Sequence, residues 1–333
     1  MKKILLLSLS VLLLSVCTFA FQVTMVTDSG GLGDQSFNDG TWAGVEKAAT
    51  ELGIESRVIQ SHEQSDFVPN LSQAAQNSEC VIAVGYMLEE ALKAVAPQYP
   101  DTDFIGIDMG ELGQPNIRTY SFKEQEGGFL AGFIGAAMTN TGIISVVGGI
   151  PIAPVQRYEI GYRAGASAYN QIHDADVQVL VGYVQSFIDV QKGKTMTVSQ
   201  QSQGADITFQ IAGLSGLGVF EAVKSAGEGY YAIGADMDQD YLVEGRVLCS
   251  ALKRIDNAAY YGIKDSYEDF FSGGLVTLGL VEDGIGISPM TYTRDKVPEH
   301  ILLEISGIVY SAKTGVLKIP ETEEELERFV VKF

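Results

Sequence analysis

The sequence has few of the residues on which metal centres and many hydrolytic sites depend, with three cysteines and three histidines among 333 residues. No CxxC pair and no Cys/His spacing occurs, so we expect no bound metal and no other cofactor. The histidines, His62, His173 and His300, are scattered, and no GxSxG motif follows a strand-like run. A Ser/His/Asp or Cys/His site is therefore not expected either.

Positive charge is also scarce, because 22 Lys and Arg oppose 42 Asp and Glu, for a net charge of −20. Nucleic acid and anionic membrane surfaces would be repelled, so we expect neither as a partner. Proline is rare, with nine residues, and 46% of the chain is hydrophobic. A chain of this length and composition can bury two packed domains, and nothing in it suggests disorder.

The N-terminal segment MKKILLLSLSVLLLSVCTFAF has two lysines before an apolar run that is too short for a transmembrane helix. This pattern predicts an export signal over residues 1–20 and a periplasmic location. Cleavage before Phe21 would release a soluble protein, which we favour. In the alternative, Cys17 becomes the lipidated first residue of a membrane-tethered lipoprotein.

Beyond the signal, strand-like apolar runs alternate with helix-like segments. The runs are VTMVTD, SRVIQS, CVIAVGY, DFIGID and IRTYSF, and after residue 122 the pattern restarts with GIISVVGG, VQVLVGYV, ADITFQIAG, YYAIGAD and VLCSAL. Repeated strand–helix units give parallel sheets covered by helices, so two series predict an α/β protein with two doubly wound lobes. A closed eight-unit barrel is the alternative, but DFIGID and IRTYSF follow each other without a helix.

The loop after the first run, DSGGLGDQSFNDG, lies where ligands bind in open α/β sheets, at the carboxyl end of a strand. Gly30, Gly31 and Gly33 allow the backbone to approach a ligand closely. The loop is not a phosphate cradle, because Asp28 and Asp34 flank the glycines and no lysine follows them.

Six blocks along the chain resemble the basic membrane protein family. They are DSGGLGDQSFNDGTWAGVEKA, FKEQEGGFLAG, SVVGGIPIAPVQRYEIGYRAG, FQIAGLSGLGVFEA, IGADMDQ and VLCSALKRID. Members of that family are substrate-binding proteins of ATP-driven importers, and the best understood ones bind purine nucleosides. Leu214 departs from the pattern, since the family more often has a small or polar residue there.

The resemblance implies a type I periplasmic binding protein fold, in which the chain crosses between two lobes three times and the ligand lies between them. Lobe 1 would comprise residues 21–122 and about 253–285, and lobe 2 residues 123–252 and about 286–333. We expect a monomer without enzymatic activity. Its partners would be a purine nucleoside (inosine, guanosine or adenosine) and the membrane permease and ATPase of an ABC importer.

A nucleoside needs aromatic side chains for stacking and acceptors for its hydroxyl groups. Phe37, at a loop–helix junction, and Phe209, near a strand end, are the expected stacking pair. Asp236 suits the ribose diol, and Lys253 would donate a hydrogen bond and partly neutralise it. The predicted ligand-binding set is Asp28, Ser29, Gly30, Phe37, Asn38, Asp108, Phe209, Gly213, Asp236 and Lys253.

Other functions stay open at this point. A sugar or signalling-molecule receptor of the same fold would be favoured if Phe209 proved to be buried within its lobe. An exported nucleoside hydrolase would need a calcium site, for which DMDQD, residues 236–240, is the one candidate. Phosphorylated ligands should be rejected, because Asp28, Asp108 and Asp236 would repel them.

Overall fold

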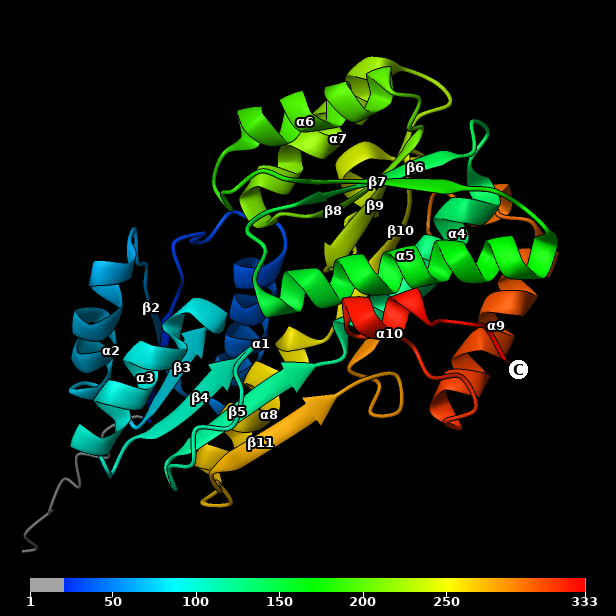
Figure 1. The fold of residues 1–333 in the computed structure, drawn as a ribbon. Coiled ribbons are helices and arrows are strands. Elements are labelled where there is room, and N and C mark those ends of the chain that lie inside the picture. The colour runs from blue at the N-terminus through cyan, green and yellow to red at the C-terminus, as the bar shows by residue number, and fades with distance from the viewer. Residues whose placement is uncertain (1–20, 333) are drawn as a thin grey trace, which may run out of the picture.

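The computed structural model describes residues 21–332 (Figure 1). The predicted export signal and Cys17 lie outside the described residues. Within the described range, no helix has the length and apolar character that a membrane span requires.

The first lobe is built on a sheet of six parallel strands in the order β11-β5-β4-β3-β1-β2. The strands are β1 (Gln22–Val26), β2 (Glu55–Ile59), β3 (Cys80–Val84), β4 (Asp103–Ile107), β5 (Ile117–Phe122) and β11 (Gly274–Leu278). The helices are α1 (Phe37–Leu52), α2 (Phe67–Ala75), α3 (Glu89–Val95) and α8 (Ile255–Tyr267).

Helices cover both faces of this sheet. Successive side chains of a strand point to opposite faces, so neighbouring residues contact different helices. Val23 and Met25 share a core cluster with α1 and α8, whereas Val26 belongs to a second cluster with α2 and α3. The central strands β3 and β4 therefore read as continuous apolar runs, as expected for parallel strands buried on both faces.

The second lobe repeats the plan with the order β12-β10-β9-β8-β6-β7, and only β12 runs antiparallel to its neighbour. The strands are β6 (Ile143–Gly148), β7 (Gln178–Tyr183), β8 (Ile207–Ile211), β9 (Tyr231–Asp236), β10 (Val247–Lys253) and β12 (Ile285–Ile287). The helices are α4 (Glu124–Met138), α5 (Ala153–His173), α6 (Val190–Ser202), α7 (Leu217–Ala226), α9 (Glu299–Lys313) and α10 (Glu323–Glu327).

Helices α4 and α5 pack backbone to backbone, which explains the glycines in the FLAG and YRAG parts of two blocks. A Cβ at Gly132 would lie 2.0 Å from the carbonyl oxygen of Tyr162, and one at Gly165 would lie 2.0 Å from that of Phe129. Any larger residue at either position would force the two helices apart.

The predicted fold class is confirmed: two doubly wound, mainly parallel sheets form two lobes (Figure 1). The chain passes between the sheets three times, after β5, after β10, and between β11 and β12. The strands β11 and β12 were not expected from the sequence. The residue boundaries of the lobes stay a prediction.

In each sheet the strand order reverses between two central strands, β1 and β3 in the first lobe and β6 and β8 in the second. Helices diverge to opposite faces at such a point, so the carboxyl ends of the strands border a crevice. The two crevices face one another, and the candidate site lies between them.

Candidate functional site

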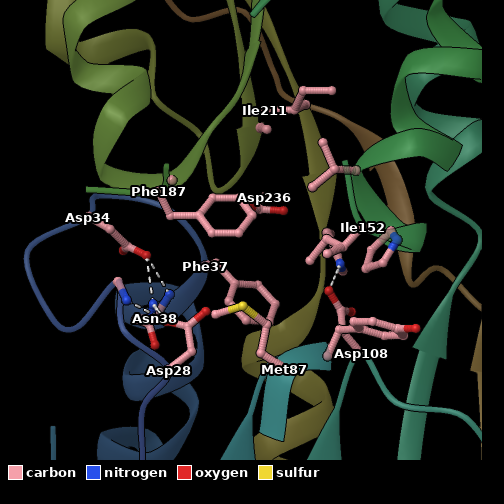
Figure 2. Close-up of a pocket in the computed structure, with 18 of the residues that line it drawn as sticks. Asp28, Asp34, Phe37, Asn38, Met87, Asp108, Ile152, Phe187, Ile211 and Asp236 are labelled. Atoms are coloured by element: carbon pink, nitrogen blue, oxygen red, sulfur yellow. Dashed lines mark hydrogen bonds and ion pairs between the residues drawn. The ribbon is translucent and has the colours of Figure 1, made fainter. Parts of the chain in front are cut away.

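A cavity of about 650 Å³, counted with its open side, lies between the lobes (Figure 2). Eight of the ten predicted residues line it: Asp28, Gly30, Phe37, Asn38, Asp108, Gly213, Asp236 and Lys253. Ser29 and Phe209 do not.

The structure corrects the placement of Phe209. Its side chain is fully buried in the middle of β8, stacked on Tyr162 at 5.1 Å between ring centroids and edge-on to Tyr158 at 5.8 Å. Phe209 and Ile211 lie on the same face of β8, but Phe209 is two residues farther from the carboxyl end of the strand. Ile211 and Gly213 therefore reach the cavity, and Phe209 does not. Phe209 is therefore part of the core of lobe 2.

Phe187, which we did not predict, supplies a phenylalanine ring from lobe 2. It lies between β7 and α6, and Figure 2 shows its ring and that of Phe37 in the same space, one from each lobe. Gly149 leaves room for this ring, since a Cβ there would lie 2.3 Å from it. A signal was present, because Phe187 follows the strand-like run VQVLVGYV just as Phe37 follows the first run.

Asp28 and Asn38 form one end of the lobe 1 wall, tied to each other and to the start of α1. Asp28 Oδ1 accepts hydrogen bonds from the Gly30 backbone N–H, at 2.8 Å, and from Asn38 Nδ2, at 3.0 Å. The same Asn38 amide donates to Asp34 Oδ2 at 3.1 Å. Both N–H groups of the Asn38 side chain are thus used, and burial raises the pKa of Asp28.

Asp34 stabilises the first turn of α1. Its carboxylate accepts from the backbone N–H groups of Ser36, Asn38 and Asp39 at 3.0, 2.8 and 3.1 Å. Those groups have no partner inside the helix, and a negative charge there is favoured by the helix dipole. Burial nevertheless raises the pKa of Asp34 to about 6.

Lys253, at the end of β10, is almost fully buried and lies at the floor of the cavity. Its Nζ lies 2.5 Å from Asp108 Oδ2 and 2.9 Å from Glu124 Oε1, and Glu124 is held by Arg157 at 2.6 Å. Burial alone would lower the pKa of Lys253, but Asp108, Glu124 and Asp236 together raise it. Lys253 thus forms its ion pairs with Asp108 and Glu124. Its charge also favours the ionised form of Asp236, so it partly neutralises that carboxylate without forming an ion pair with it.

Asp236 joins the two lobes. Its Oδ2 accepts a hydrogen bond of 2.6 Å from Ser36 Oγ in lobe 1, and its Oδ1 lies 3.4 Å from the Tyr158 hydroxyl. The backbone of Asp236 has φ +66°, a left-handed conformation that turns the chain at the strand end. Burial raises the pKa of its carboxyl group.

A second pair of hydrogen bonds joins the same edges of the lobes. Gln239 Nε2 donates to the Gln35 carbonyl oxygen at 2.7 Å, and the Tyr241 hydroxyl donates to Gln35 Oε1 at 2.6 Å. The loop before α1 is therefore attached to lobe 2 by side chains that do not line the cavity.

The side chains around the cavity suit the binding of a small molecule. In the described part of the chain no group of three or more His, Cys, Asp or Glu side chains is placed to hold a metal ion, and this includes the DMDQD segment. The cavity instead offers two phenylalanine and two tyrosine side chains, three strand-end carboxylates and a paired lysine. Such a surface fits a flat, uncharged ligand that carries many hydrogen-bond donors.

Comparison with known proteins is consistent with this geometry. The family model of PnrA-like ABC transporter substrate-binding proteins matches residues 21–323. The chain is 34% identical to an uncharacterised lipoprotein of Pyrococcus furiosus, over 94% of this chain and 85% of that protein. It is 30% identical to basic membrane protein A of Borreliella burgdorferi, over 94% and 91% of the two chains. A solved solute-binding protein of an ABC transporter system from Aeropyrum pernix has 30% identity and a TM-score of 0.86, over 92% and 96% of the two chains.

Proposed function

Because the chain belongs to the basic membrane protein family of PnrA-like ABC transporter substrate-binding proteins, we propose that it captures a purine nucleoside and delivers it to a membrane permease and its ATPase. The protein is a binding protein and not an enzyme. Inosine, guanosine and adenosine are the candidate ligands.

The observation that carries the proposal is the pair Phe37 and Phe187, which enter one cavity from opposite lobes (Figure 2). A base held between two such rings would gain about 1–3 kcal/mol from each. Stacking against rings from both lobes also links binding to closure, since neither ring alone encloses the base.

The carboxylates support a neutral ligand with hydroxyl groups. Asp28, Asp108 and Asp236 outnumber Lys253, which is already paired with Asp108 and Glu124. A phosphate would place further negative charge against the unpaired acids in a site of reduced dielectric, at a cost of several kcal/mol. We therefore propose that nucleosides bind and nucleotides do not.

A sugar is the second candidate, and the burial of Phe209 within lobe 2 is the observation that favours it. Sugars need acceptors for hydroxyl groups and one apolar wall, and this cavity has both. Phe187 weakens that reading, because it restores the second aromatic ring that a base requires.

Thermal unfolding in the presence of single ligands separates the two. We expect inosine, guanosine or adenosine, each at about 1 mM, to raise the melting temperature, because a ligand that binds only the folded state stabilises it. The matching 5′-monophosphates and ribose should cause no such shift. A shift with ribose or another sugar, and none with the three nucleosides, would refute the proposal.

The names of the Pyrococcus relatives support export by the lipoprotein route through Cys17, the alternative to cleavage before Phe21. The mass of the mature protein from its native membrane or culture fluid distinguishes them. A lipid-modified chain beginning at residue 17 establishes the first route, and an unmodified chain beginning at residue 21 the second.

A further inference from the structure

The strand β11 forms a free edge of the lobe 1 sheet, because it pairs with β5 on one side and with no described strand on the other (Figure 1). The Lys123 N–H donates a hydrogen bond of 2.9 Å to the Leu278 carbonyl oxygen, so the backbone groups of Leu278 face β5. The N–H and C=O groups of one residue point to the same side of a strand, and successive residues alternate. Val276 therefore also faces β5, whereas the backbone groups of Leu275 and Thr277 point away from the sheet.

This edge lacks the features that usually keep the edges of sheets apart. Natural edge strands are commonly protected by charged side chains, proline or bulges. The stretch FFSGGLVTLGLV, residues 270–281, has no charged residue and no proline, in a chain with 42 Asp and Glu and 22 Lys and Arg. The opposite edge of the same sheet is protected, since β2 carries Glu55 and Arg57.

Exposed apolar side chains lie within β11 and beyond both of its ends. Leu275 and Val276 in the strand are 41% and 36% exposed. Phe270 before the strand is 72% exposed, and Val281 after it is 53% exposed. Exposed apolar side chains that are grouped in this way mark an interaction surface.

We propose that β11 pairs with β11 of a second copy of this chain, antiparallel and around a two-fold axis at Val276. Leu275 of one copy then faces Thr277 of the other, and each such pair exchanges both of its N–H···O bonds. The unpaired backbone groups thus complement themselves, as an interface between identical copies requires. The same pairing brings the end that carries Phe270 toward the end of the second copy that carries Val281. The proposal replaces the monomer expected from the sequence.

The dimer should be weak, because a five-residue edge buries less than the roughly 800 Å² per partner of a stable complex. The chain has a net charge of −20, so two copies repel each other at long range although the paired edges are uncharged. Added salt screens this repulsion and should strengthen the dimer, whereas it would weaken an interface built on ion pairs.

Sedimentation velocity of the mature protein at about 1 to about 100 µM, in low and in high salt, measures the dimer directly. Thr277→Pro is the sharpest variant, because the N–H that it removes points away from β5 and proline is tolerated at such edge positions. The two hydrogen bonds that are lost both lie in the interface, so the Kd of the dimer should rise about 5- to 150-fold.

Val276→Lys tests the same edge even if Thr277→Pro does not fold. It places two like charges opposite each other at the two-fold axis, at Cα atoms about 4.5 Å apart. Directly opposed like charges destabilise strand pairing, so the Kd of the dimer should rise at least about 10-fold. Circular dichroism shows whether each variant is folded.

Val181→Lys is the matched control, since it makes the same substitution in β7, the edge strand of the lobe 2 sheet. It should leave the Kd of the dimer unchanged, and a rise with this variant alone would place the interface at β7 and overturn the proposal. A protein that stays monomeric up to about 100 µM also overturns it and leaves the edge to a different partner, such as an extended segment of the permease. A dimer that neither folded β11 variant weakens refutes it as well.

Discussion

Replacing Phe209 and Phe187 by alanine, one at a time, should separate folding from binding. Phe209 is fully buried and stacked on Tyr162 in the core of lobe 2, so Phe209→Ala leaves a cavity that neighbouring side chains fill only partly. Such truncations cost about 3–5 kcal/mol, which for a chain of this size is roughly 4–8 °C in melting temperature.

Phe187→Ala should behave in the opposite way. This side chain is half-buried at the cavity wall, so the ligand-free melting temperature should change little. Loss of one stacking surface should weaken the binding of a nucleoside by about 1–3 kcal/mol, which raises its Kd roughly 5- to 150-fold. Phe37→Ala should resemble it, because Phe37 lines the same cavity from lobe 1.

The assay is differential scanning fluorimetry without ligand, followed by calorimetric titration with the tightest nucleoside. The wild type and the three variants are compared at one temperature where all of them are folded. If Phe187→Ala binds like the wild type while Phe209→Ala folds normally and loses binding, the placement of both rings is refuted. Equal loss of stability in the two variants would refute the core assignment.

Three further predictions concern the polar groups. Asp236→Asn should weaken nucleosides far more than free bases in calorimetric titrations, because the ribose diol loses a charged acceptor; equal weakening would contradict this role. Burial raises the pKa of Asp34 to about 6 in the folded state, so the folded protein holds this proton more tightly than the unfolded chain. Stability should therefore fall by up to roughly 3 kcal/mol as the pH rises from about 4 to about 6. Urea unfolding across that range checks this, and a slope that persists in Asp34→Asn would argue against it. Tyr241→Phe removes the hydroxyl bonded to Gln35 and should weaken all nucleosides by the same small factor, about 2- to 10-fold, mainly through faster dissociation. In stopped-flow measurements the exposed Tyr261→Phe is its control, and a change in selectivity would contradict the reasoning.

The fold could be predicted because β1 to β10 are apolar runs that mostly alternate with helical segments, and a doubly wound arrangement covers such strands with helices. The strands β11 and β12 were not predicted from the sequence, for physical reasons. Leu275 and Val276 in β11 are largely exposed and pair on one side only, and β12 has three residues. Neither has the continuous apolar pattern of a central strand.

The sequence predicted those site residues whose position follows from the end of a strand, such as Asp28, Asp108 and Asp236. The prediction for Phe209 was wrong because Phe209 lies in the middle of β8 and not at its carboxyl end. Every residue of this strand is buried, so the apolar pattern does not indicate where the strand meets the cavity. Glu124 was missed because an acid at the start of a helix usually meets solvent. Its contact with Lys253 depends on two chain crossings that meet only in the folded protein.

The hydrogen bonds from Gln35 and Ser36 to lobe 2 join protein to protein, so they favour closure by the same amount whatever the cavity holds. Stabilising contacts that do not discriminate between ligands add to the affinity for each of them and also increase the fraction of empty receptor that is shut. A shut empty receptor has the shape that a permease recognises but carries no cargo. These contacts must therefore be weak enough that closed receptors with a ligand outnumber closed empty ones at the transporter. This requirement limits how much of the ligand affinity can come from contacts between the lobes. Discrimination between full and empty receptors has to come from the aromatic rings and carboxylates that line the cavity.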